Sequence, residues 1–304
     1  MAISVNGARF IAHVVRRGIS LGSLVTVGRQ SLYAPKSAVN RMLATTGRAE
    51  RYRLAPGDPG YPLAGEWADE LYPLFGATSV RVLDGSAYEG ADLVQNLNQP
   101  LPTALHESFD CLLDGGTLEH VFNVPEALAS YMKLVKVGGH VMLLDMPATN
   151  GCGHGFYQFS PALFWQVFAA QHGFEVVDML VVEAAPFAPF WRVGNPAVLK
   201  RRVELVHPAC CYLYVVARKL RAFAGFAPMP VQDDYATSWQ ADGTAAPGAG
   251  VQTSLGTRVR RLAARLAPMA YWRMTNRRNN ARTAGEATLG GTAATNPYTR
   301  VREQ

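Results

Sequence analysis

Cysteine is scarce in this chain, and the few cysteines that it has are not arranged as a cross-linked or metal-binding set. There are four in 304 residues, with no CxxC or Cys/His metal spacing: Cys111, Cys152, Cys210 and Cys211. Small disulfide-stabilised folds need a much higher density of cysteine. The sequence therefore excludes a disulfide scaffold, and we expect these thiols to be reduced and structural.

Long apolar runs are also missing. The longest apolar stretches, near 141–144 and 210–217, are far shorter than the roughly 20 residues that a membrane-spanning helix requires. The first twenty residues have no apolar segment after a basic start, so no signal peptide is expected. These absences predict a cytoplasmic protein without a membrane span.

Lysine is absent from residues 232–304, although this stretch is strongly basic. It holds ten arginines against five acidic residues, whereas residues 1–231 carry 19 basic and 18 acidic groups. The high isoelectric point thus belongs to the tail and says little about what the remaining chain binds. Clustered arginine alone does not indicate nucleic-acid binding, which we do not expect.

The composition changes near Pro230 and divides the chain into three parts. Residues 1–231 read as one Rossmann-like domain, and residues 232–257, rich in Ala, Gly, Thr and Pro, read as a flexible linker. Residues 258–304 combine a basic amphipathic helix with a tail that lacks a core-forming pattern. Such a helix indicates contact with an anionic membrane surface or a protein partner, or simply a solvated extension.

Short apolar runs alternate with helical patterns through the first part. Helices are expected over residues 7–17, 36–46, 61–75, 125–136 and 160–173, and strands over residues 24–27, 80–84, 91–97, 109–114, 138–147, 174–184 and 210–219. The early strands are continuous apolar runs, which is typical of a parallel sheet covered on both faces. The last two lack an intervening helix, so an antiparallel edge hairpin is expected. The pattern predicts an α/β, doubly wound, seven-stranded sheet.

Ligands of such sheets bind beyond the carboxyl ends of the strands, and polar residues follow those ends here. Asp84 ends the second strand, where a carboxylate suits the vicinal hydroxyls of a ribose. Glycines that follow the fourth strand would let a ligand approach the backbone closely. The chain has no GxGxxG dinucleotide motif and no GxxxxGK[ST] triphosphate motif, which argues against those nucleotide-using enzymes.

Three segments carry a resemblance to a known family: FDCLLDGGTLEHV, GGHVMLLDMPA and GHGFYQFSP. Together with the order of elements over residues 20–220, they resemble class I S-adenosylmethionine-dependent methyltransferases, especially bacterial members that modify sugars and polysaccharides. The resemblance implies a Rossmann-like sheet with an antiparallel last strand. It also implies S-adenosylmethionine as the cofactor, and O-methylation of a sugar or glycan-related small molecule.

The resemblance also implies roles for individual residues. Asp84 would hold the cofactor ribose and Asn96 would lie beside the adenine. The methionine side of the cofactor would be lined by Asp114, Gly115, Gly116 and Thr117. Tyr157 and Gln158 would lie on the substrate side. His154 is the first choice for a general base, because an imidazole titrates near neutral pH, and His120 is the second.

One motif departs from the family pattern. The acidic, glycine-rich turn expected after the first strand is replaced by LVTVGRQSLY, in which only Gly28 remains. Arg29 would either pair with the cofactor carboxylate or block its site. The second hypothesis is therefore a non-catalytic, methyltransferase-like protein that binds a ligand or a partner.

Several of these residues also have a purely structural interpretation. Asp84 and Asp114 could cap the turns that follow their strands, and His154 could fix its own loop. Asp114, Asp145 and Asn150 could share a divalent ion, but their spacing is not diagnostic, and no metal ion is predicted.

Overall fold

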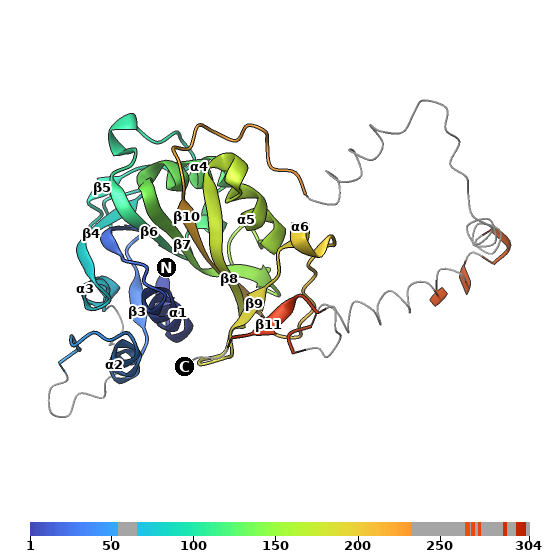
Figure 1. The fold of residues 1–304 in the computed structure, drawn as a ribbon, viewed down its shortest axis with the longest axis horizontal. Helices are drawn as coiled ribbons and strands as arrows, with labels where there is room; N and C mark the ends of the chain where they lie inside the picture. The colour runs from blue at the N-terminus through green and yellow to red at the C-terminus, as the bar shows by residue number, and fades with distance from the viewer. Residues whose placement is uncertain are drawn as a thin grey trace.

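The computed structural model describes residues 1–53, 66–232, 265–267, 269–270, 273–274, 288–290 and 296–301. Its centre is a nine-stranded sheet in the order β11-β9-β8-β10-β7-β6-β2-β4-β5 (Figure 1). The strands are β2 (Gly22–Val27), β4 (Ala77–Asp84), β5 (Leu93–Val94), β6 (Phe109–Gly115), β7 (Val135–Thr149), β8 (Phe174–Glu183), β9 (Trp191–Val193), β10 (Cys211–Lys219) and β11 (Tyr298–Arg300). A separate parallel pair joins β1 (Ala2–Ser4) to β3 (Ser31–Tyr33).

Six of the seven expected strands run parallel, and one runs against them. The pairs β4–β5, β2–β4, β2–β6 and β6–β7 are parallel, and β10 is antiparallel to both β7 and β8. The predicted α/β fold with an antiparallel last strand is therefore confirmed. The chain reverses its direction of growth between β2 and β6, and this switch point is where doubly wound sheets bind ligands.

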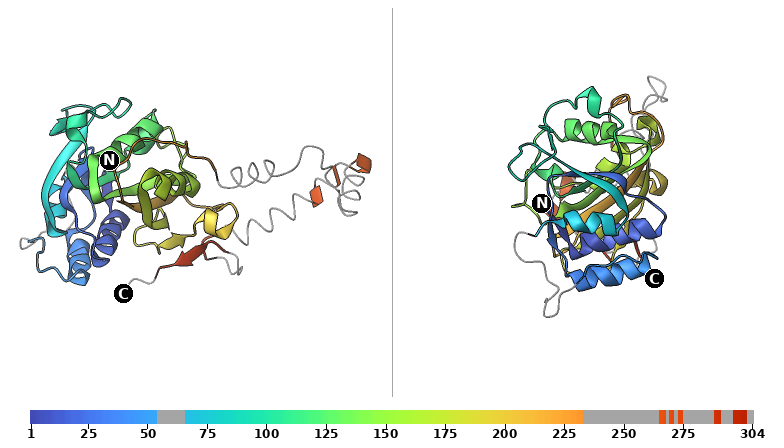
Figure 2. Two further views of the ribbon diagram at one scale, coloured as in Figure 1. Left: turned by 45° about the horizontal axis from the view of Figure 1, so that its top comes forward. Right: turned by 90° about the vertical axis from the view of Figure 1, so that its left-hand side faces the viewer.

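Helices cover both faces of the sheet, as the apolar strands require (Figure 2). They are α1 (Val5–Arg16), α2 (Lys36–Thr45), α3 (Leu71–Leu74), α4 (Val124–Leu134), α5 (Pro161–Val167) and α6 (Pro196–Leu199), with 3-10 turns η1 (Ala68–Glu70), η2 (Thr103–Leu105), η3 (Leu118–His120) and η4 (Ala170–His172). Side chains alternate between two apolar clusters: Leu112 and Leu143 pack with α4 and α5, while Leu113 and Leu144 pack with α1, α2 and α3.

The sheet differs from the prediction at its edge. The last two expected strands are antiparallel to each other, but β10 lies between β7 and β8, so they do not form an edge hairpin. Two strands of three residues, β9 and β11, extend the sheet beyond β8. Tyr298 of β11 is buried, and its hydroxyl donates to the carbonyl of Glu204 at 2.9 Å. The expectation that this part of the tail has no core contact is therefore wrong.

Three further expectations are met only in part. The strand expected over residues 91–97 is reduced to β5, because the side chain of Asn96 accepts a hydrogen bond from the Asn98 backbone and turns the chain. The helix over residues 160–173 has the expected Ser160 cap and left-handed Gly173, but it breaks into α5 and η4. The helix expected over residues 61–75 is seen only as η1 and α3, and residues 54–65 lie outside the described part.

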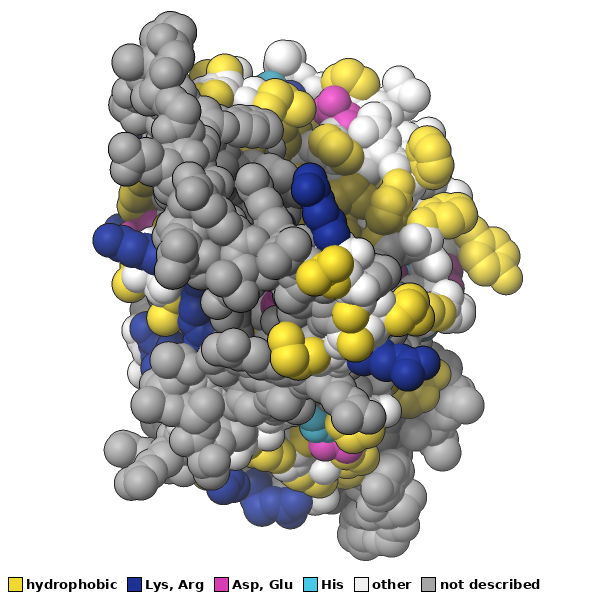
Figure 3. All heavy atoms as spheres, turned by 90° about the vertical axis from the view of Figure 1, so that its right-hand side faces the viewer, with side chains coloured by type: hydrophobic (Ala, Val, Ile, Leu, Met, Phe, Trp, Pro, Cys, Tyr) yellow, Lys and Arg dark blue, Asp and Glu magenta, His cyan; other side chains and the backbone are white. Residues whose placement is uncertain are grey.

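Residues 233–257 and most of residues 258–304 lie outside the described part, so the linker and the amphipathic helix stay predictions. Within the described residues, no helix is long and apolar enough to cross a membrane. The face in Figure 3 carries hydrophobic side chains over much of its described surface, with Lys and Arg between them.

Two buried charged side chains join separate elements. Asp178 of β8 accepts hydrogen bonds from His13 at 3.0 Å, from Arg17 at 2.8 Å and from Arg192 at 2.8 and 2.9 Å. Lys219 of β10 donates to the carbonyls of Met132 and Val135 at 2.9 and 2.8 Å, at the end of α4. Both groups are almost fully buried, so their partners hold α1, α4 and β9 against the sheet.

Candidate functional site

The turn after β2 keeps the glycine that the sequence singled out. Gly28 has a left-handed backbone (φ +71°), and its amide donates to the carbonyl of Leu83 at 2.7 Å. A Cβ at this position would come within 2.1 Å of the Met1 sulfur, so the Met1 side chain fills the space in front of the glycine. The Thr117 hydroxyl lies 2.7 Å from the same sulfur and 2.9 Å from the carbonyl of Val27. Gly28 and Thr117 thus line one small region, and their contact with a cofactor stays a prediction.

The two residues after Gly28 are held by the protein itself. The Arg29 guanidinium pairs with Asp69 of η1, bonds the carbonyl of Glu89 at 3.2 Å and lies over the Trp67 ring. The Gln30 amide folds back onto the carbonyls of Val27 and Gly28, at 2.7 and 3.2 Å. Of the two alternatives for Arg29, pairing with a ligand carboxylate would compete with Asp69, which already neutralises its charge in this arrangement.

Beside this turn, the carboxyl end of β4 leaves space that a ligand could occupy. Asp84 is half-buried, and its carboxylate has no partner within the described residues. A Cβ added at Gly85 would meet nothing within 4 Å, and one added at Gly90 would meet only the Arg29 guanidinium, at 3.3 Å. An unpaired carboxylate next to bare backbone is suited to a ligand with hydroxyl groups. Asn96 lies in the neighbouring exposed loop, but its side-chain oxygen is taken up by Asn98.

Asp114 has the structural role that the sequence left open. Its buried carboxylate accepts from the amides of Thr117 and Leu118, at 2.7 and 3.1 Å, and from the hydroxyl of Tyr131 at 2.8 Å. Burial raises its pKa to about 6, and these hydrogen bonds oppose the rise. The expectation that Asp114 lines the ligand space is wrong, because its oxygens point into the turn. It instead positions Gly116, whose φ is +92°, and Thr117.

A cluster of one carboxylate and two imidazoles follows this turn. Glu119 of η3 is fully buried, with one oxygen 3.2 Å from Nε2 of His154 and 4.0 Å from Nε2 of His120. Neither carboxylate oxygen has a hydrogen-bond partner within the described residues. Burial, followed by the charges of Asp114 and Asp145, raises the pKa of Glu119 to about 8. Burial and the nearby His154 lower the pKa of His120.

The loop after β7 is tied to η3 by its backbone. The amide of Phe156 donates to the carbonyl of Glu119 at 2.7 Å, and the amide of His154 donates to that of Gly151 at 2.9 Å. Gly155 has a φ of +78°, and a Cβ there would lie 2.7 Å from the Glu119 carbonyl oxygen. The loop can carry His154 this close to Glu119 only because residue 155 is glycine.

Tyr157 and Gln158, expected on the substrate side, use their polar atoms to shape this loop. The Tyr157 hydroxyl donates to the carbonyl of Phe122 at 2.8 Å, and the Gln158 carbonyl accepts from the amide of Gly151 at 2.9 Å. Asp145 and Asn150, which with Asp114 were weighed as ligands of a divalent ion, are also engaged in other hydrogen bonds. Asp145 bonds Tyr214 and Ser4, and Asn150 donates to the carbonyls of His207 and Ala209.

Two exposed aromatic side chains beside the cluster were missed by sequence reasoning. Phe122 and Phe156 are 74% and 70% exposed and make an edge-to-face pair with ring centroids 6.3 Å apart. Each lies two residues from a histidine of the cluster. Aromatic residues exposed next to reactive groups commonly contact ligands. In the sequence, they could not be distinguished from core phenylalanines.

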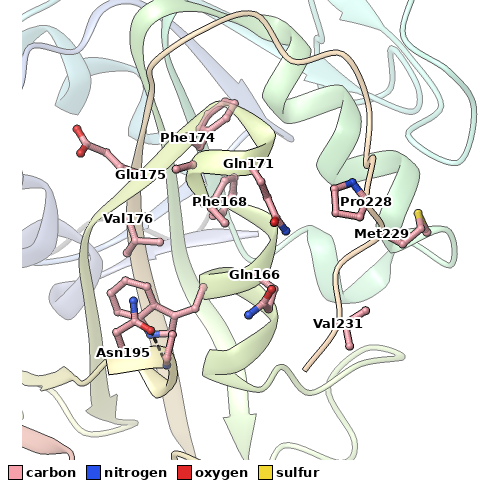
Figure 4. A pocket seen from close by; sticks show the side chains of 14 residues that line it. Gln166, Phe168, Gln171, Phe174, Glu175, Val176, Asn195, Pro228, Met229 and Val231 are labelled. Carbon is pink, nitrogen blue, oxygen red and sulfur yellow. Dashed lines mark hydrogen bonds between the residues drawn. The ribbon is translucent and has the colours of Figure 1, made fainter. Parts of the chain in front are cut away.

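A large hollow lies away from this site. Its volume is about 680 Å³, and residues of α5, η4 and the start of β8 line it together with Pro228, Met229 and Val231 (Figure 4). The hollow lies at the amino-terminal end of β8. Because β8 runs parallel to β7, this is the opposite end of the strands from Asp84, Thr117 and His154. Its lining has no group of reactive side chains comparable to that cluster.

No known protein-family profile and no curated protein sequence matches the chain. Solved structures similar to it include an S-adenosylmethionine-dependent methyltransferase of Thermotoga maritima (16% identity, TM-score 0.38), with 71% of this chain and 91% of that chain covered. A Burkholderia thailandensis 1,6-didemethyltoxoflavin-N1-methyltransferase has 15% identity and TM-score 0.35, with 71% and 78% covered. The branched-chain polyamine synthase of Thermus thermophilus has 15% identity and TM-score 0.36, with 72% and 56% covered. These TM-scores are too low to bear on activity, so function has to be argued from the site.

Proposed function

We propose that this protein is an S-adenosylmethionine-dependent methyltransferase that transfers the methyl group to a hydroxyl of a small-molecule acceptor. The proposal is supported by the strand order, with a switch point between β2 and β6 and an antiparallel β10. The observation that carries it is the unpaired carboxylate of Asp84 at the carboxyl end of β4, next to the open backbone of Gly85.

The residues present fit the cofactor at its ribose end. Asp84 can accept hydrogen bonds from two vicinal hydroxyls, and the turn at Gly28 brings bare backbone close to that position. When bound, the cofactor supplies an activated methyl group on a sulfonium centre.

The space that would receive the methionine part of the cofactor is narrower than the space at its ribose end. The Met1 side chain lies over Gly28, and a Cβ at Gly115 would come within 2.5 Å of the Gln30 side chain. Met1 is 42% exposed and flexible, so it can move aside, but Gln30 is buried and fixed. We expect Thr117 and the backbone of Gly28 and Gly116 to contact the cofactor there, and Arg29 to hold the adjacent loop.

The acceptor side is formed by the histidine cluster. His154 is half-exposed and is the group best placed to take a proton from an acceptor hydroxyl, with His120 beside it. Phe122 and Phe156 offer apolar faces to the non-reacting part of the acceptor. A sugar or glycan acceptor fits this rim, but its support is the sequence resemblance alone.

The cofactor proposal is tested by calorimetric titration of the full chain with S-adenosylhomocysteine. We expect a dissociation constant on the order of micromolar, weakened at least about tenfold by Asp84→Ala, because hydrogen bonds to a charged group are worth about 1.5–3 kcal/mol. Glu89→Ala is the matched control, since Glu89 contacts Arg29 through its backbone carbonyl. His154→Gln should keep this affinity while methyl transfer is lost.

Gln30 favours a second candidate function, a non-catalytic protein that keeps the fold but not the cofactor. Its amide caps the carbonyls of Val27 and Gly28 and narrows the space beside Gly115. If S-adenosylhomocysteine does not bind the unchanged chain but does bind Gln30→Gly, Gln30 excludes the cofactor and this second function is the correct one.

We also infer that the basic tail mediates a peripheral contact, with an anionic membrane surface or with a protein partner. Co-sedimentation with phosphatidylserine vesicles tests the first of these, with the unchanged chain compared with one in which Arg258, Arg261 and Arg265 are replaced by Gln, so that β11 is kept. Equal sedimentation of the two proteins would contradict the membrane contact.

A further inference from the structure

We propose that Glu119, His120 and His154 form a binding site for one divalent transition-metal ion of the Zn²⁺ type. Metal binding does not depend on the proposed methyltransferase activity. If that activity holds, the ion would lie on the acceptor side and could polarise the acceptor hydroxyl in place of a histidine base.

The first argument is that the carboxylate of Glu119 is buried without a hydrogen-bond donor in the described part of the chain. Its side chain has no exposed surface, and neither oxygen accepts a hydrogen bond from the described residues. Burying a carboxylate without a donor is costly, and proteins normally place a cation beside it. The Nε2 atom of His154 is near enough, at 3.2 Å, but the two groups are not aligned for a hydrogen bond. A metal ion between them would satisfy both.

The second argument is the geometry of the three ligand atoms. One nitrogen from each histidine and one Glu119 oxygen lie within 4.8 Å of one another. Metal–ligand distances of about 2.0–2.2 Å place the ligands of one ion about 3–3.5 Å apart. The His154–Glu119 pair already meets this, and His120, at 4.0 Å and 48% exposed, can close the remaining gap by rotating its side chain.

The third argument is that the backbone holds the ligands in place. Glu119 and His120 are consecutive in η3, whose turn is fixed by Asp114. The loop that carries His154 is fastened to the carbonyl of Glu119 through the Phe156 amide, and it packs there through Gly155. The site therefore brings together the segments after β6 and β7 before any ion binds, which limits the cost of ordering the ligands.

The ligand types select the class of ion. Two imidazoles with one carboxylate suit Zn²⁺, Co²⁺, Ni²⁺, Mn²⁺ or Fe²⁺, whereas Mg²⁺ and Ca²⁺ prefer oxygen ligands. Both histidines are about half exposed, so coordination positions remain for water or for an acceptor oxygen.

The experiment is a titration of the full chain with Zn²⁺ and, separately, with Co²⁺ after treatment with a chelator. We expect one Zn²⁺ to bind per chain, measured by competition with a chromophoric chelator. We also expect bound Co²⁺ to give a visible absorption spectrum typical of a Co²⁺ ion with few ligands. His154→Gln and Glu119→Gln should each weaken Zn²⁺ binding at least about tenfold. Because His154 is on the surface, its variant should fold normally, which circular dichroism would verify.

Two controls are matched to the site. His207→Gln removes a histidine that lies 4.0 Å from the carboxylate of Glu183 but has no third ligand among the described residues, and it should leave binding unchanged. Cys152→Ser removes the exposed thiol in the His154 loop, and it should also leave binding unchanged. Zn²⁺ binding that is absent, or that survives both site variants, would overturn the proposal. Titrating the metal-free chain with S-adenosylhomocysteine tests the cofactor site separately, so the two proposals can fail independently.

Discussion

Gly155 shows how a single residue sets the geometry of the site. Its left-handed backbone and missing side chain let the loop after β7 pack directly on Glu119. The structure shows a tight contact at this position of the GHG sequence. The position of His154 therefore depends on a neighbour that has no functional group of its own.

We predict that Gly155→Ala displaces His154 and weakens Zn²⁺ binding at least about tenfold. The added methyl group would lie 2.7 Å from the Glu119 carbonyl oxygen and 2.8 Å from its Cγ, and the strained backbone adds about 1–3 kcal/mol. Gly153→Ala is the control, because a Cβ there meets nothing within 4 Å. Chelator competition on the two variants measures the difference, and equal affinities would contradict the prediction.

At the residue scale, the sequence predicted where the site residues lie in the fold better than it predicted what their side chains do. Asp84 and Thr117 follow strands whose apolar pattern is clear, so their place at the sheet edge could be foreseen. Glu119 could not be recognised as a ligand candidate, because its burial depends on packing between η3 and a loop thirty residues later. Asp114 fits two roles equally in the sequence, and only the hydrogen bonds from Thr117 and Tyr131 distinguish them.

At the scale of elements, the end of α4 shows how a distant strand completes a helix. The last carbonyls of a helix have no partner within the helix itself. Here the ammonium group of Lys219, from β10, bonds the carbonyls of Met132 and Val135 and pairs with Glu107 at 3.0 Å. A buried positive charge at this end also complements the helix dipole.

We predict that Lys219→Met lowers the free energy of unfolding by about 2–3 kcal/mol, because it leaves two buried carbonyls without donors. Lys136→Met is the contrast: Lys136 is 44% exposed and pairs with Asp110 near the surface, so its loss should cost no more than about 1 kcal/mol. Urea unfolding of both variants measures the two values. Similar values would show that Lys219 does not support α4.

The main elements could be predicted because their apolar patterns are long. The core strands and α1, α2 and α4 all appear near their expected bounds. The strands β1, β3, β9 and β11 were missed because three residues carry no measurable pattern. The break between α5 and η4 has no signal in the sequence that we can name.

At the scale of the molecule, Asp178 joins the first helix to the extended edge of the sheet. Burial acts to raise the pKa of Asp178, but the hydrogen bonds from His13 and Arg192 outweigh it and hold that pKa well below its usual range. A carboxyl with a lowered folded-state pKa stabilises the fold above its unfolded-state pKa of about 3.9, and this stabilisation is lost as the pH falls further.

We predict that Asp178→Ala lowers the free energy of unfolding by about 2–4 kcal/mol at neutral pH, because the basic side chains that face Asp178 would lose their buried partner. The difference from the unchanged protein should shrink as the pH falls below about 4. Glu175→Ala, which removes an exposed partner of Arg218 at 4.0 Å, should cost less than about 1 kcal/mol. Urea unfolding at several pH values measures this, and a difference independent of pH would contradict the assignment.

The pairing of β11 with β9 has a consequence for how the chain folds. Tyr298 meets Val193 only after residues 194–297 have been synthesised, so this contact closes a long loop late. Closure entropy grows slowly with loop length, so the delay matters more for timing than for stability. Until β11 arrives, the edge of β9 offers unpaired backbone groups to any extended segment nearby. The edge of β9 is therefore open to wrong partners until β11 has been synthesised and has paired with it.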